Sequence, residues 1–127
     1  MHLVLLAGLG GENNGFNFDG YGRGELLVTV PVGWRVVVDC ENRGRTRHSC
    51  AIVAGSLAAR PAFRGAATPA PAAGLQPGAR ATFSFRAAQL GSFRIACLVP
   101  GHEQARQWDV LDVVRGGRPS ISARRGP

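Results

Sequence analysis

The chain has 127 residues, of which 45% are hydrophobic, so its length and composition fit one globular domain with a core of its own. The formal net charge is +7, yet the 15 basic residues, all arginines, are scattered along the chain without a basic helix or interleaved aromatic residues, which argues against nucleic-acid binding. No run approaches the roughly 20 apolar residues that a membrane-spanning helix requires.

Hydrophobic residues recur with a period of two, which predicts short strands rather than helices. The first apolar run, residues 1–10, lacks the basic start and the small-residue cleavage site of a signal peptide and is interpreted as a strand. Gly- and Pro-containing turns separate the further expected strands, at 26–30, 34–41, 49–53, 80–87, 91–99 and 107–114. The sequence therefore predicts an all-β fold, an antiparallel sandwich or a Greek-key barrel.

Two segments depart from this pattern. Residues 54–78 are rich in Ala and Pro, too long for a hairpin loop and not periodic, so we expect an excursion over the surface. Residues 115–127, RGGRPSISARRGP, have the composition of a disordered segment. We therefore expect one domain over residues 1–114 and a disordered tail over residues 115–127.

Cys40 and Cys50 flank the turn ENRGRTRHS. If the strands before and after this turn form a hairpin, the two cysteines are cross-strand neighbours with Cα atoms about 4.5 Å apart, near the lower limit for a disulfide. The alternative is a pair of buried free thiols. The disulfide is the favoured interpretation, and it implies an oxidising compartment.

The stretch CLVPGHEQARQW places a third cysteine, Cys97, at the end of a strand and His102 in the following turn. His48, on the inward face of another strand, and Gln107, after the turn, complete a set of four candidate metal ligands. Two imidazoles and one thiolate with a weak axial Met or Gln form the blue-copper arrangement. Zinc would accept the trio but usually draws paired thiolates. A nucleophilic Cys–His pair lacks a recognisable third residue that orients the histidine.

Several segments resemble the small blue copper proteins, the cupredoxins, and most closely their sulfocyanin-like branch. They run from FNFDGYGRGELLVTVPVGWRVVV through RHSCAIV and FRGAATPAPAAGLQPGARATFSF to CLVPGHEQARQWDVLDVV, with VPGH and GAATP the most specific. The resemblance implies a Greek-key β-sandwich with one type 1 copper ion bound by His48, Cys97 and His102. The branch normally has an axial methionine, whereas this chain has Gln107 there, as stellacyanin does, and its only methionine is Met1.

The resemblance further implies a single-electron carrier, not an enzyme, whose copper cycles between Cu(II) and Cu(I). We expect electrons to pass through the exposed edge of His102, beside the apolar residues 98–100. The amide oxygen of Gln107 is a harder donor than a thioether, so a potential below that of a Met-ligated relative is expected. The alternatives are a copper carrier that delivers metal, a sandwich that has lost its metal, and an enzyme in which an exogenous ligand replaces Gln107.

The expected partners are redox proteins, namely an acidic cytochrome or the copper subunit of a terminal oxidase, because a basic chain favours encounters with acidic surfaces. No nucleic acid and no small-molecule substrate is expected, and the chain is predicted to be a monomer. The expected location is extracytoplasmic, in the periplasm or on the outer face of the membrane, with a signal or anchor not present in this chain.

Overall fold

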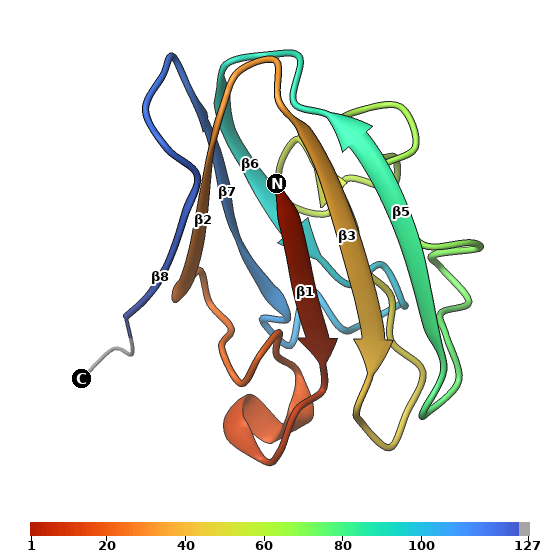
Figure 1. Cartoon of the computed structure of the whole chain (residues 1–127). Coiled ribbons are helices and arrows are strands. Elements are labelled where there is room, and N and C mark those ends of the chain that lie inside the picture. Colours follow the sequence, from red (N-terminus) through yellow and green to blue (C-terminus); the bar gives the residue numbers. More distant parts are fainter. Residues whose placement is uncertain (125–127) are drawn as a thin grey trace.

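The computed structural model describes residues 1–124, which form a sandwich of two β-sheets (Figure 1). Among these residues no helix is long and apolar enough to cross a membrane. The regular elements are one short 3-10 turn, η1 (Glu12–Gly15), and the strands β1 (His2–Ala7), β2 (Leu26–Pro31), β3 (Arg35–Asn42), β4 (Ala51–Val53), β5 (Arg80–Arg86), β6 (Gly91–Ala96), β7 (Trp108–Val114) and β8 (Ser120–Ala123).

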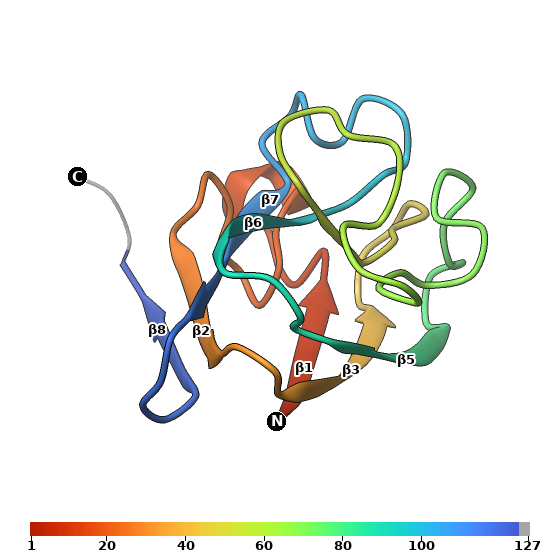
Figure 2. The ribbon, with the colours of Figure 1, turned by 90° about the horizontal axis from the view of Figure 1, so that it is seen from above.

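The first sheet has the strand order β1-β3-β5 and the second has the order β4-β6-β7-β2-β8. In the view from above, β1, β3 and β5 form one layer and β6, β7, β2 and β8 belong to the other (Figure 2). The prediction of an all-β sandwich is confirmed, although not every strand pair is antiparallel. The pairs β1–β3 and β2–β7 are parallel. The first parallel pair arises because β2 lies in the other sheet, so the chain leaves the first sheet after β1 and returns to it as β3 in the same direction.

The core lies between the sheets and is built by side chains that alternate along each strand. On β3, for example, Val36, Val38 and Cys40 are buried while the residues between them are partly exposed. Phe63, from the segment between β4 and β5, stacks on Phe85 at 5.4 Å between ring centroids and also contacts Phe93 of the other sheet. Removal of such a buried ring typically costs about 3–5 kcal/mol, so Phe63 fastens the long segment to the core.

The long segment, residues 54–78, follows the edge of β4 as irregular chain. The backbone N–H of Ala62 donates to Ile52, that of Ile52 donates to Ala66, and that of Thr68 donates to Cys50. The expected excursion is therefore present, and in Figure 1 its yellow-green and green loops lie beside β5. These hydrogen bonds satisfy backbone groups at the edge of the second sheet, which would otherwise be unpaired.

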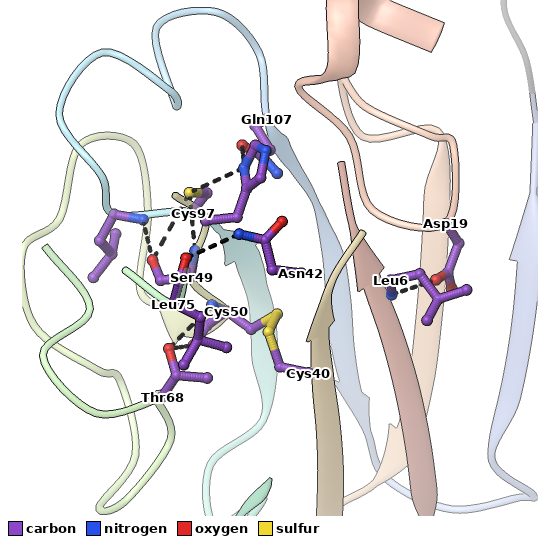
Figure 3. Close-up of a disulfide and its surroundings, with 12 residues drawn as sticks. Leu6, Asp19, Cys40, Asn42, Ser49, Cys50, Thr68, Leu75, Cys97 and Gln107 are labelled. Carbon is purple, nitrogen blue, oxygen red and sulfur yellow. Dashed lines mark hydrogen bonds between the residues drawn. A yellow bond between two sulfur atoms is a disulfide. The ribbon is translucent and has the colours of Figure 1, made fainter. Parts of the chain in front are cut away.

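The disulfide between Cys40 and Cys50 is present, but the hairpin predicted to position it is wrong. Cys40 lies on β3, which pairs with β1 and β5, whereas Cys50 precedes β4 in the other sheet. The Cα atoms are 6.1 Å apart, and the bond joins the two sheets across the core (Figure 3). The turn between the cysteines crosses from sheet to sheet because the side chain of Asn42 holds it there, with Nδ2 donating to Thr46 O and to Leu75 O.

The expectation of a disordered tail over residues 115–127 also differs from the structure. Ser120–Ala123 form β8, which pairs antiparallel with β2, while residues 125–127 lie outside the described residues. The side chains of β8 are all exposed, so its composition carries no core signal. Backbone hydrogen bonds to the open edge of β2 hold it instead, and such bonds do not depend on side-chain type.

Candidate metal centre

The four predicted ligands come together at the end of the sandwich where β3 ends and β7 begins. His48 precedes β4, Cys97 follows β6, and His102 and Gln107 belong to the connection from β6 to β7. The Nδ1 atoms of His48 and His102 lie 4.0 Å and 3.4 Å from Cys97 Sγ. The ligand atoms of these three residues all lie within 4.8 Å of one another. Gln107 Oε1 lies 2.9 Å from His48 Nδ1, so the amide oxygen faces the same point.

His48 is held by backbone contacts on both sides of its ring. Its N–H and C=O pair with Leu75, which fixes the main chain. The Nε2 edge packs directly on Gly8 and Gly44, where an added Cβ would lie only 2.7 Å and 2.8 Å from Nε2. Gly8 also has a φ of +75°, which disfavours other residues. The ring is therefore confined, with Nδ1 directed toward Cys97.

Cys97 is buried at the end of β6, and its sulfur accepts hydrogen bonds. The backbone N–H of Ser49 donates to Cys97 Sγ over 3.3 Å, and Ser49 Oγ lies 3.8 Å from the same sulfur. Ser49 Oγ also accepts from the backbone N–H of Leu98, which ties the residue after Cys97 to the segment that carries His48. Hydrogen bonds to a thiolate sulfur tune a metal site. Sequence reasoning missed Ser49, whose only signal is its place directly after His48.

The amide of Gln107 is fully buried, and its orientation is fixed by its partners. Nε2 donates to the backbone carbonyl of Asn17 over 2.9 Å, which leaves Oε1 facing His48. Figure 3 shows Gln107 and Cys97 on the same side of the disulfide. Because the nitrogen end of the amide has its own acceptor, the oxygen end is the one available to a metal.

A buried ion pair holds the loop that carries His102. Glu103 accepts from Arg94 of β6 over 3.0 Å and from the backbone N–H of Leu57 over 2.6 Å. The guanidinium of Arg94 lies 3.8 Å from the ring centroid of Trp108. Glu103 follows His102 and Trp108 follows Gln107, so one arginine contacts the neighbours of two predicted ligands. Sequence reasoning missed this cluster because its members are far apart in the chain.

The electrostatics of the pocket favour neutral side chains. Burial raises the pKa of the Cys97 thiol, and the backbone N–H of Ser49 opposes part of this rise. Burial also lowers the pKa of the imidazoles of His48 and His102. Without a metal the site therefore holds a thiol and uncharged imidazoles, and a bound cation would displace the thiol proton.

The donor atoms fit one metal ion of the copper or zinc size. Metal–nitrogen bonds of about 2.0 Å and metal–sulfur bonds of about 2.3 Å place neighbouring donors about 3–4 Å apart. The distances from Cys97 Sγ to the two imidazole nitrogens, 3.4 Å and 4.0 Å, match that spacing. One thiolate, two imidazoles and an amide oxygen form the donor set that suits copper better than a structural zinc site.

Two depressions flank the site. The first, about 700 Å³, is mainly apolar and lies beside Cys97; we call it the apolar depression, lined by Leu57–Ala59, Ala70–Ala73, Cys97–Gly101, Glu103 and Gln104. The second, about 610 Å³, lies over His48; we call it the basic groove, lined by Gly8, Gly10, Gly11, Asn14–Phe16, Arg43–Thr46 and His48. His102 itself is half-buried, because the ring of Phe16 packs against it with 4.9 Å between centroids.

Comparison with protein families gives one match. The model of the sulfocyanin (SoxE) domain matches residues 2–68. This span contains strands β1–β4 and His48, whereas Cys97, His102 and Gln107 lie beyond it. Their assignment therefore depends on the geometry described above. No curated protein matches the sequence significantly.

Solved structures give further matches. Dithionite-reduced auracyanin from Roseiflexus castenholzii is 26% identical with a TM-score of 0.67, and the match covers 89% of this chain and 96% of that one. Rusticyanin from Thiobacillus ferrooxidans is 22% identical with a TM-score of 0.63, covering 89% and 76%. A blue copper oxidase from Nitrosomonas europaea is 24% identical with a TM-score of 0.67, but this chain covers only 38% of it. The sandwich therefore has the same fold as these proteins.

Proposed function

Because the chain belongs to the sulfocyanin (SoxE) domain family, whose cofactor is one copper ion, we propose that it is a type 1 copper protein that carries single electrons between redox proteins. The observation that carries this proposal is the convergence of three buried or half-buried donor atoms, from His48, Cys97 and His102, within 4.8 Å. When bound, copper would supply a reversible one-electron change between Cu(II) and Cu(I).

The protein's own residues would make electron transfer fast because they keep nearly the same positions in the two oxidation states. Donors from the turn before β4, the end of β6 and the loop before β7 are each fixed by backbone hydrogen bonds, so little has to move between the two oxidation states. The N–H of Ser49 would stabilise negative charge on the sulfur of Cys97. Gln107, as the axial ligand, would favour Cu(II) and lower the reduction potential relative to a thioether.

Electron exchange would take place at the end of the molecule that carries His102. The half-buried edge of this ring is the proposed exit, and the apolar depression beside Cys97 offers a surface for a short-lived complex. The net charge of +7 favours an acidic cytochrome or the acidic face of the copper subunit of a terminal oxidase. The chain would act as a monomer and without a small-molecule substrate, as a carrier and not an enzyme.

The disulfide supports a location outside the cytoplasm, because such bonds persist in oxidising compartments such as the periplasm. Retention of Cys97 as the single free cysteine of residues 1–124 is consistent with a metal-bound thiolate there.

The proposal is tested by visible absorption of the copper-loaded protein. We expect an intense thiolate-to-copper band that a reductant bleaches and an oxidant restores. The variant Cys97→Ser should lack the band, whereas Ser92→Ala, an exposed change on β6, the strand that precedes Cys97, should keep it. Copper that binds without the band would reject the electron carrier and favour the delivery of copper to other proteins.

A further inference from the structure

The basic groove is a second face of the site, separate from the apolar depression. The two depressions share no lining residue. One wall of the groove is the loop Gly8–Phe16 and the other is the turn Arg43–Thr46, which leads directly into His48. The groove therefore lies beside the upstream histidine, whereas the apolar depression lies beside Cys97 and the downstream loop.

The wall formed by the loop Gly8–Phe16, which we call the glycine wall, leaves the groove open. A Cβ added to Gly10, Gly11 or Gly15 would meet nothing within 4 Å. At these three glycines the loop presents main chain to the groove, while Asn14 and Phe16 also line the same wall. The glycines let an extended peptide segment approach this part of the wall closely, because they carry no side chain.

The opposite wall is positively charged. Arg43 and Arg45 line the groove and are exposed. Arg43 lies 3.9 Å from Glu41, a contact at the edge of ion-pair distance. Arg47 is exposed as well but does not line the groove, and its guanidinium donates to Gly74 O. Among the described residues, the lining thus contains two arginines and no carboxylate, which favours an anionic occupant.

The floor of the groove is the imidazole of His48. Its Nε2 edge contacts the backbone at Gly8 and Gly44, and its Nδ1 faces Gln107 Oε1 at 2.9 Å and Cys97 Sγ at 4.0 Å. A single aromatic ring therefore separates the bottom of the groove from the ligand set. A group bound in the groove would contact His48 directly, just as a group bound in the apolar depression would contact Cys97 directly. Both depressions therefore lie one residue away from the proposed metal position.

We propose that the basic groove is the docking surface for a carboxylate-rich segment of the redox partner; this inference rests on the proposed electron-carrier function. Carboxylates pair with the planar guanidinium groups of the turn by charge-assisted hydrogen bonds. The glycine wall provides room for the main chain of the segment. Because the apolar depression stays free, the partner is oriented by the groove while its apolar surface contacts the residues near Cys97.

Two variants of equal charge test the proposal. The first, the turn triple, is Arg43→Gln, Arg45→Gln, Arg47→Gln. It removes the two arginines that line the groove and Arg47, which follows them in the chain. The control triple Arg86→Gln, Arg115→Gln, Arg118→Gln removes three exposed cations at the opposite end of the sandwich, where β5 and β7 end. All these arginines are exposed, so both triples should keep the fold.

The first measurement uses the metal-free protein and a hexaglutamate peptide, followed by NMR of the backbone amides. We expect shifts in residues 8–16 and 43–48. At about 50 mM salt, where the Debye length is about 14 Å, the turn triple should bind at least about tenfold more weakly while the control triple changes by less than about threefold. Equal losses in the two triples, or shifts centred on residues 98–104, would overturn the proposal.

The second measurement uses the copper-loaded protein on gold electrodes with carboxylate or methyl coatings. The turn triple should lose most of its electron exchange on the carboxylate coating and keep it on the methyl coating, where the apolar depression makes contact. Similar exchange by the two triples on the carboxylate coating would contradict the proposal. Absence of electron exchange by the wild type on both coatings would reject the electron-carrier function. The peptide titration would still test whether the basic groove binds a carboxylate-rich segment.

Discussion

Replacement of the Cys40–Cys50 disulfide by two alanines is expected to destabilise the metal-free protein by at least about 3 kcal/mol. The bond closes a loop with a sequence separation of 10, and a loop of that length corresponds to about 2.7 kcal/mol of lost chain entropy in the unfolded state. Both sulfur atoms are fully buried, so their removal also leaves small cavities in the core. For a domain with a typical stability of about 5–15 kcal/mol, the loss is a large fraction.

The assay is urea unfolding at neutral pH, followed by the fluorescence of the two tryptophans. The matched control is Cys97→Ala, which removes a buried sulfur without removing a cross-link. Its loss should be clearly smaller than that of Cys40→Ala, Cys50→Ala. Reduction of the wild-type disulfide by dithiothreitol should reproduce most of the loss without any substitution.

The result that would refute this reasoning is a loss no larger than that of the control. It would mean that the bond restricts the unfolded chain much less than its loop length implies, and that the core and the contacts of Asn42 hold the two sheets together without it. A midpoint that moves while the slope of the transition stays constant would assign the change to stability alone.

Three further predictions concern the site and its surroundings. Gln107→Met should raise the reduction potential measured by voltammetry, because a thioether favours Cu(I); an unchanged potential would remove Gln107 from the ligand set. Burial raises the pKa of Asp109 to about 8, so this carboxyl should contribute a downward slope of stability in the metal-free protein as the pH rises from about 4 to about 8, a window in which only its folded state retains the proton. Asp109→Asn should remove this slope in urea unfolding, unlike Asp112→Asn on the other face of β7, and an unchanged slope would contradict the prediction. Arg94→Met and Glu103→Gln should each broaden the visible band and speed the loss of copper to a chelator, and the double variant should be no worse than either single one; additive effects would show that the ion pair does not act as a unit.

The positions of the strands could be predicted well, because each buries one face. The segments expected at 34–41, 80–87 and 107–114 correspond to β3, β5 and β7 within one residue at either end. The partners of the strands could not be predicted in the same way. Periodicity identifies the buried face of a strand but not its neighbour, which is why both strands exist as β3 and β4 whereas the hairpin expected between them is wrong.

The ligand set could be proposed because its chemistry depends on residue type. Cysteine and histidine are rare in this chain, and the structure brings one thiol, two imidazoles and an amide oxygen together. That these four groups bind copper stays a prediction. The groups that orient them carry no such signal. Gln107 is oriented by the backbone carbonyl of Asn17, which any residue would offer, and Cys97 accepts from the backbone N–H of Ser49. Glu103 meets Arg94 only because the loop folds back on β6.

The long segment after β4 divides into a part that is built into the core and a part that is not. Phe63 and Thr68 anchor its first half, whereas the stretch Ala70–Ala73 closes on itself, with the N–H of Ala73 donating to Ala70. That stretch also forms one side of the apolar depression. Its side chains can therefore be exchanged with little effect on the four predicted ligands, and the surface beside the proposed copper site can change what it recognises while that site stays the same.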